Sequence, residues 1–123
     1  MKIAITGSSS NFGKCLSNFL KTKNCKIINI NKENNFFLER SEKYKFKEKK
    51  IDILIHLAHS YTSKGYEVNY KGTTNLFKTA KQHKIKKLIF VSSISSMSNA
   101  LSLYGKTKFK IEQYCLKNNI III

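Results

Sequence analysis

The sequence contains no proline, only one arginine (Arg40) and only seven acidic residues. No internal repeat or low-complexity linker interrupts it, so we find no domain boundary within residues 1–123. No apolar run approaches the roughly 20 residues that cross a bilayer. No secretory signal follows Met1 either, so we expect a soluble, cytoplasmic protein without a membrane partner.

Cysteine is also scarce. Cys15, Cys25 and Cys115 are odd in number and widely spaced, and none belongs to a CxxC pair. This pattern argues against a disulfide framework or a zinc module and predicts buried or half-buried thiols in a reducing compartment. His56 and His59 resemble a metal pair, but no third ligand is near them in the sequence, so we expect no metal site.

The shortage of acidic residues leaves a formal net charge of +16. Such a charge raises nucleic acid as a partner, because clustered cations release counterions from phosphate. The charge comes almost entirely from lysines scattered between Lys2 and Lys117, without the arginine forks and interleaved aromatics of a nucleic-acid groove. Nucleic-acid binding is therefore the least favoured function that we consider.

β-Rich segments alternate with segments of helical periodicity. Strands are expected at 2–6, 26–30, 51–57, 87–92 and 120–123, with a possible short strand at 36–38. One helix is expected where Phe12, Leu16, Phe19 and Leu20 recur at helical spacing. Two more are expected over 66–83 and over 104–117. Because helices of this length connect parallel strands, the sequence predicts an α/β fold with a doubly wound parallel sheet. The last strand has no helix or cap behind it, so we also expect a truncated chain.

The first strand is followed by a turn of small residues, Gly7 to Gly13, before a helix. A phosphate group binds well at such a point, because free backbone N–H groups and the positive end of the helix dipole face it. Gly13 would let the helix pack closely on the strand. Ser10 stands where glycine is expected, which keeps the small size but restricts φ.

Tyr104 and Lys108 lie four residues apart at the start of a predicted helix. This spacing puts both side chains on one face. A neighbouring ammonium favours the phenolate form of a phenol, so the pair is suited to proton transfer near neutral pH. An amphipathic helix start with an exposed lysine explains an isolated YxxxK equally well.

The order of these motifs resembles the extended short-chain dehydrogenase/reductase family, in particular its sugar-nucleotide epimerases and dehydratases. The resemblance covers nearly the whole chain and is carried by ITGSSSNFG, IDILIHLAH (read as a fourth strand), VNYKGTTNLFKTAKQHKIKKLIFVSS and YGKTKFKIE. The compact stretch 31–50 and the ending YGKTKFKIEQYC also look like the dTDP-4-dehydrorhamnose reductases of the same family.

The resemblance implies roles for particular residues. The diphosphate of the cofactor would be held by Gly7, Ser10, Asn11, Phe12 and Gly13. Leu57 and Ala58 would line the cofactor, and Asn69 would support the site from its helix. Tyr104 would be the acid/base, Lys108 would hold the nicotinamide ribose, and Ser93 would orient the substrate hydroxyl, with Ser92, Ser95 and Ser96 as alternatives. Asn31, with Lys32 beside it, replaces the acidic residue expected at the ribose, and this favours NADP over NAD as the cofactor.

The implied function is an NAD(P)-dependent epimerase, dehydratase or reductase that acts on a nucleotide sugar by hydride transfer, with a tyrosine as acid/base. Most of the C-terminal substrate domain of this family would be absent, so 1–123 would be the NAD(P)-binding Rossmann domain. Activity of this chain alone is then in doubt. The alternative is a non-catalytic NAD(P)-binding or regulatory module. A homodimer is possible.

Overall fold

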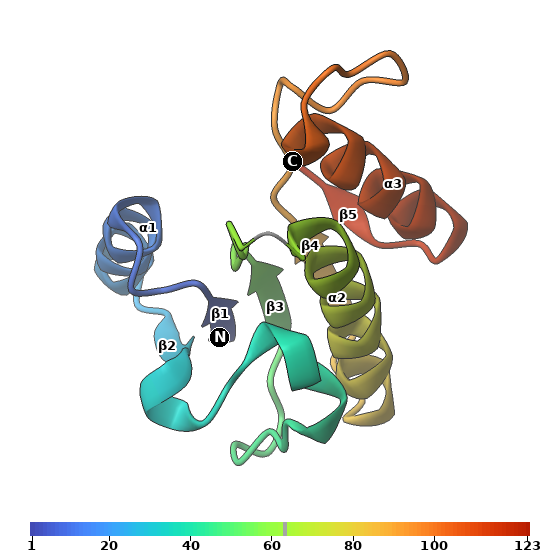
Figure 1. The fold of residues 1–123 in the computed structure, drawn as a ribbon. Coiled ribbons are helices and arrows are strands. Elements are labelled where there is room, and N and C mark those ends of the chain that lie inside the picture. Colours follow the sequence, from blue (N-terminus) through green and yellow to red (C-terminus); the bar gives the residue numbers. More distant parts are fainter. Residues whose placement is uncertain (63) are drawn as a thin grey trace.

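The computed structural model describes residues 1–62 and 64–123 and contains a parallel five-stranded sheet in the order β2-β1-β3-β4-β5 (Figure 1). The strands are β1 (Lys2–Thr6), β2 (Lys26–Ile30), β3 (Ile53–His56), β4 (Lys87–Phe90) and β5 (Ile121–Ile122). The helices are α1 (Asn11–Thr22), α2 (Gly65–Gln82) and α3 (Leu103–Lys117), with the 3-10 helices η1 (Lys32–Asn34) and η2 (Leu38–Lys43). The predicted doubly wound α/β sheet is confirmed.

Alternate side chains of each strand serve different layers, because successive residues of a strand point to opposite faces. Ile3, Ile5 and Ile55 form one buried cluster, against which Leu16 and Leu20 of α1 pack. In Figure 1, α1 covers this face of the sheet, and α2 and α3 cover the other. The central strands β1 and β3 are therefore buried on both faces, as is typical of a parallel sheet.

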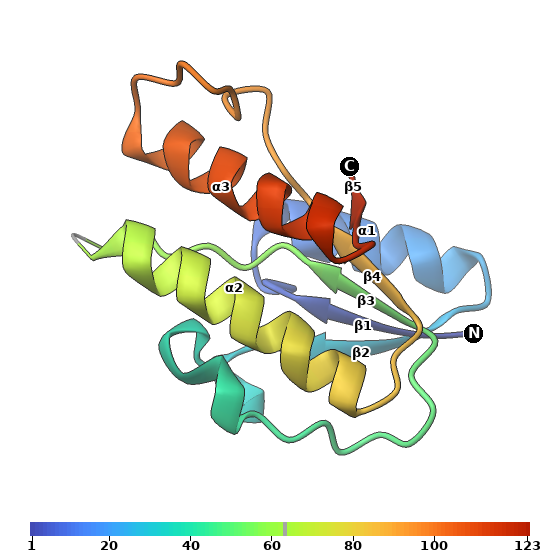
Figure 2. The ribbon, with the colours of Figure 1, turned by 90° about the vertical axis from the view of Figure 1, so that its right-hand side faces the viewer.

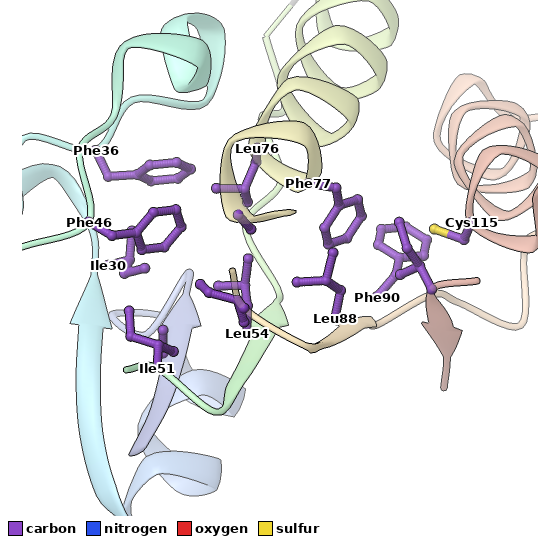
Figure 3. Packing of buried hydrophobic residues seen from close by; sticks show 14 of the residues in the cluster. Ile30, Phe36, Phe46, Ile51, Leu54, Leu76, Phe77, Leu88, Phe90 and Cys115 are labelled. Carbon is purple, nitrogen blue, oxygen red and sulfur yellow. The ribbon is translucent and has the colours of Figure 1, made fainter. Parts of the chain in front are cut away.

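The larger core lies on the α2 and α3 side of the sheet (Figure 3). Leu76 and Phe77 of α2 are fully buried there and meet Leu54 and Phe90 from the strands. Cys115 of α3 belongs to the same cluster. Each fully buried aliphatic or aromatic side chain of this kind contributes about 1.5–3 kcal/mol, so this layer carries much of the stability.

The stretch 36–38 is not a strand, and this prediction was wrong. Phe36 follows η1, and Leu38 begins η2. Both side chains are buried in the larger core, where η2 packs against α2. A turn with Asn35 in the left-handed region (φ 60°) precedes them. The segment read as a fourth strand is consequently the third, β3.

Other predictions needed smaller corrections. The strands expected at 51–57, 87–92 and 120–123 are each shorter at their ends. Phe12 and Phe19 are on the exposed side of α1, each 58% exposed, so only Leu16 and Leu20 of the predicted stripe face the sheet. Cys15 is exposed, whereas Cys25 is half-buried and Cys115 buried, and all three are free thiols. Among the described residues, none of the helices has the length and apolar character to cross a membrane.

The topology fixes where a ligand can bind. From β1 the chain passes to β2 on one side and then returns to β3 on the other side of β1. In Figure 2 the strands run lengthwise one above another, with α2 in front of the sheet and α1 behind it. In an open parallel sheet, the crevice beyond the strand ends at such a reversal is the usual ligand site. The turns after β1 and β3 are therefore the place to look.

Candidate functional site

A pocket of about 960 Å³ lies beyond the carboxyl ends of the strands. Nine of the residues predicted for the site line it: Gly7, Ser10, Phe12, Asn31, Lys32, Leu57, Ala58, Tyr104 and Lys108. Asn11, Gly13, Asn69 and Ser93 do not line it. Its walls thus join the turn after β1 with the first two turns of α3, as the motif order suggested. Its size is at the upper end of ordinary small-molecule pockets.

The turn after β1 is shaped by backbone contacts. Gly7 takes a φ of 69°, a conformation that favours glycine, and a Cβ there would lie 2.8 Å from the Ala58 nitrogen. A Cβ on Gly13 would overlap the Gly7 carbonyl oxygen. Ser10 has an ordinary extended conformation and caps α1, since its Oγ accepts from the Gly13 N–H at 3.0 Å. Serine therefore replaces glycine at position 10 without strain.

The opening of α1 faces the pocket. Asn11 is the first residue of the helix and is exposed, while Phe12 and Ser9 line the pocket wall. The first turn contains no acidic residue, so nothing there opposes an anion at the positive end of the helix. Sequence reasoning missed Ser9, although it stands inside the predicted turn.

The far wall comes from the segment after β2. Asn31 caps η1, with its Oδ1 accepting from the Asn34 N–H at 3.3 Å, and Lys32 lines the pocket beside it. Two carboxylates also line this wall, Glu33 and Glu39. Apolar contacts are added by the residues that sequence reasoning did not assign to the site, namely Ile30, Phe36, Phe37 and Leu38.

A buried polar chain lies behind the turn after β3. The Thr6 Oγ1 accepts from the backbone N–H groups of Leu57 and Ala58 at 3.2 and 3.3 Å and lies 2.6 Å from His56 Nδ1. Because that oxygen already accepts twice, its O–H donates to Nδ1 and leaves Nε2–H for the Thr73 hydroxyl, 2.8 Å away. Both ring nitrogens of His56 are thus occupied, which leaves none for a metal.

Burial sets the protonation state of the His56 imidazole. Loss of solvent, with the positive charges of Lys108 and His59 nearby, lowers the pKa of His56 to about 3. The imidazole is therefore neutral at neutral pH. Through Thr6, it helps to fix the backbone of Leu57 and Ala58 at the pocket wall.

Asn69 lies behind the pocket wall, 1% exposed. Its Oδ1 accepts from the Ser60 N–H at 2.8 Å, and its Nδ2 donates to the carbonyls of Ser60 at 2.7 Å and Gly65 at 2.5 Å. The amide therefore ties together two ends of the segment between β3 and α2. That segment supplies Ala58, His59 and Ser60 to the pocket, which is how a residue outside the pocket shapes it.

Tyr104 and Lys108 meet on one face of α3, as predicted. The Lys108 Nζ lies 5.7 Å from the centre of the Tyr104 ring and 4.6 Å from that of Phe90. It donates to the Val91 carbonyl at 2.9 Å, and the residue is only 4% exposed. Burial lowers the pKa of Lys108 to about 8, although the carboxylate of Glu112 acts in the opposite direction.

His59 is a pocket residue that sequence reasoning considered only as half of a metal pair. Its ring meets Tyr104 edge to face, with centroids 4.8 Å apart, and meets Tyr61 in the same way. Burial, together with the charge of Lys108, lowers the pKa of His59 to about 4. A neutral aromatic ring therefore fixes one side of Tyr104. No sequence signal distinguished this contact, because it joins the loop after β3 to α3, far apart along the chain.

Ser92 and Ser93 follow β4 and have different hydrogen-bond partners. Ser92 lines the pocket, and its Oγ donates a short hydrogen bond to Glu112 of α3. The Ser93 Oγ instead accepts from the Ser95 N–H at 3.2 Å, within its own loop. Of the two, the structure brings Ser92 to the pocket surface. The role predicted for Ser93 stays a prediction.

Comparison with known proteins agrees with this geometry. The model of the NAD dependent epimerase/dehydratase family matches residues 3–119. The chain belongs to this family. A curated relative, dTDP-D-glucose 4,6-dehydratase of Dictyostelium discoideum, is 38% identical over 125 residues, covering 75% of this chain and 29% of the relative.

Solved structures of family members share the fold. UDP-glucose 4-epimerase from Bifidobacterium longum, in complex with NAD+ and UDP, matches 97% of this chain and 49% of its own, with a TM-score of 0.79 and 19% identity. A dTDP-4-dehydrorhamnose reductase from Clostridium acetobutylicum matches 95% of this chain and 49% of its own, with a TM-score of 0.74 and 25% identity. The chain therefore spans about half the length of these structures.

Proposed function

We propose that this chain forms the cofactor-binding half of an NAD(P)-dependent epimerase, dehydratase or reductase that acts on a nucleotide sugar. The observation that carries the proposal is the single pocket that joins the turn after β1 to Tyr104 and Lys108. The first feature suits a diphosphate and the second suits proton transfer. Membership of the epimerase/dehydratase family supports the same combination.

The residues fit a dinucleotide at the diphosphate end. Backbone N–H groups at the start of α1 suit a diphosphate, and the small residues Gly7, Ser10 and Gly13 keep the turn compact, because a Cβ at Gly7 or Gly13 would collide with neighbouring backbone atoms. Phe12 flanks this turn at the pocket surface, and Leu57 and Ala58 form the opposite wall. The contact of Asn11 with the diphosphate stays a prediction. When bound, the nicotinamide would exchange a hydride with a carbon of the sugar.

At the other end, Tyr104 would hold or release a proton at its phenol oxygen. Lys108 is mostly protonated at neutral pH, with a pKa of about 8, so its charge favours the phenolate. It would also donate hydrogen bonds to ribose hydroxyls, and Ser93 would orient a substrate hydroxyl. These three roles come from the family resemblance and are proposals for this chain.

The choice between the two cofactors depends on the wall after β2. We retain NADP as the proposed preference because Lys32 can pair with a 2′-phosphate while Asn31 is occupied as a helix cap. Glu33 and Glu39 line the same wall and would repel that phosphate. Comparing the dissociation constants of NADH and NADPH shows whether the attraction by Lys32 or the repulsion by Glu33 and Glu39 is larger. Homodimer formation and a cytoplasmic location stay predictions.

The decisive experiment is a fluorescence titration of the chain with NADH and NADPH. Ser9 lines the pocket and is exposed at the start of α1, so Ser9→Glu puts a carboxylate where the diphosphate would lie. A carboxylate there is compatible with the helix yet repels the ligand. We expect binding to weaken at least about ten-fold, whereas the matched uncharged variant Ser9→Gln binds like the parent. Absence of binding by the parent, or equal binding by both variants, contradicts the proposal.

A second candidate is a module that binds the cofactor without turning over a substrate. The chain spans only about half the length of the nucleotide-sugar enzymes that it matches. The two functions differ in their response to Tyr104→Phe. If the chain is catalytic, exchange at the sugar carbon occurs and is lost in Tyr104→Phe. Normal cofactor binding without such exchange, in the parent as in the variant, identifies the module.

A further inference from the structure

A pair of side chains joins the pocket to the back of α3. Ser92 lines the pocket beside Val91, Tyr104 and Lys108. Its hydroxyl donates to the carboxylate of Glu112, which is one helical turn beyond Lys108 on α3 and does not itself line the pocket. Neither Ser92 nor Glu112 is needed for the diphosphate site or for the contact between Tyr104 and Lys108.

The hydrogen bond determines what Ser92 can offer a ligand. A serine hydroxyl has one proton to donate and two lone pairs that accept. Glu112 takes the proton, because an ionised carboxylate only accepts. Ser92 therefore faces the pocket as an acceptor. Hydrogen bonds to a charged group are also the stronger ones, so the orientation is well fixed.

The charge of Glu112 reaches the other polar groups of α3. It raises the pKa of Lys108, opposing the effect of burial, and adds to the burial that raises the pKa of Cys115 to about 12. The groups near Lys108 from other elements are His56 and His59, whose pKa values of about 3 and 4 leave them neutral near pH 7.

We propose that Glu112 is a positioning residue that fixes the Ser92 hydroxyl as an acceptor for an O–H or N–H group at the nicotinamide-ribose end of the cofactor, and that it places a negative charge beside Lys108. This inference rests on the proposed function, because the ligand group belongs to NAD(P). It assigns to Ser92 a ligand contact distinct from the substrate contact proposed for Ser93.

The ligand contact is tested with two probes, NADH and ADP, which lacks both the nicotinamide and its ribose. Ser92→Ala should weaken NADH binding about five-fold, the effect of one lost hydrogen bond, and leave ADP binding unchanged. Ser98→Ala, in an exposed part of the same loop, is the matched control and should bind both probes like the parent. Equal weakening for both probes, or none for NADH, overturns the inference. Failure of the parent to bind either probe would instead count against the proposed function.

The role of Glu112 is tested by combination. Glu112→Ala should weaken NADH binding about as much as Ser92→Ala, and the double variant should be no weaker than either, because both changes remove one arrangement. Additive losses would show that Glu112 does not act through Ser92. Thermal unfolding of each variant verifies that it is folded. If Glu112→Ala does not fold, Glu112→Leu, which also cannot accept the hydroxyl proton, replaces it in the same cycle.

The charge is tested without any ligand. Titration of the lysine side-chain carbons by NMR, with the Lys108 signal assigned by its loss in Lys108→Met, follows the ammonium directly. Glu112→Gln should lower the pKa of Lys108 by roughly one unit, as expected when an opposite charge nearby is removed. Glu67→Gln, which breaks an exposed ion pair with Lys71 on α2, should leave it unchanged. If the pKa of Lys108 is unaltered in Glu112→Gln, Glu112 has only a packing role, and the proposal that its charge acts on Lys108 is overturned.

Discussion

The two ends of the pocket are built differently. From Gly7 to Gly13 the chain carries no titratable side chain and forms the site with backbone groups and close contacts. Near Tyr104 the site is formed by three buried or half-buried bases, His56, His59 and Lys108, whose pKa values are all lowered by loss of solvent. The first end should therefore respond to changes of shape, and the second to changes of pH.

The largest expected effect is acid destabilisation through His56. The folded pKa of about 3 lies below the ordinary value of 6.5. Between pH 6.5 and 3, His56 is therefore protonated in the unfolded chain and neutral in the folded chain. Stability is lost as the pH falls from 6.5 to 3, by about 5 kcal/mol if the whole shift is realised. Denaturant unfolding across this range should show a smaller loss in His56→Gln than in the parent.

The control for this prediction is His83→Gln. His83 is half-buried at the end of α2, far from the pocket, and binds the Glu48 carbonyl. Its variant should keep the acid sensitivity of the parent. If His56→Gln and the parent follow the same curve, the buried imidazole is not the acid-sensitive group.

Lys108 should affect stability in the alkaline range, whereas His56 acts in the acidic range. Its folded pKa of about 8 lies below the ordinary 10.5, so the stability that it contributes is complete above pH 10.5 and lost as the pH falls to 8. The shift of about 2.5 units corresponds to about 3 kcal/mol. Lys108→Met should remove this rise from the alkaline unfolding curve, while Lys106→Met, exposed on the same helix, should keep it. A rise that persists in Lys108→Met would assign the effect to other groups.

The turn after β1 should instead be sensitive to a single methyl group. In Gly13→Ala the new Cβ overlaps the Gly7 carbonyl oxygen, and we expect a loss of about 2 kcal/mol that is the same at every pH. Gly65→Ala at the start of α2 has its nearest neighbour at 3.2 Å, the Ser60 carbonyl oxygen, and should be nearly neutral. Equal losses in the two variants would mean that the turn has room to adjust.

The same contrast explains what the sequence predicts well. The turn Gly7–Gly13 is local, and small residues between a strand and a helix identify it without knowledge of the rest of the fold. The spacing of Tyr104 and Lys108 is local as well, and helix geometry alone puts them on one face. The sheet followed from the alternation of buried runs with helical segments.

The parts that were missed depend on contacts between distant segments. Phe36 and Leu38 are apolar and close together, which resembles a short strand, but tertiary packing on α2 holds them in turns. The contact of His59 with Tyr104 joins the loop after β3 to α3. Spacing along the chain also does not indicate that Ser92 bonds to Glu112 of α3.

One measurement tests the central claim that a single ligand joins both ends of the pocket. Backbone amide and lysine side-chain NMR signals are followed as NADH, and separately ADP, is added to the 123-residue chain. We predict that NADH shifts the signals of Gly7, Gly13 and Lys108 with one common dissociation constant, and that ADP, which lacks the nicotinamide and its ribose, shifts those of the two glycines and not that of Lys108. Shifts confined to exposed surface lysines, or a Lys108 signal indifferent to NADH, would contradict the account.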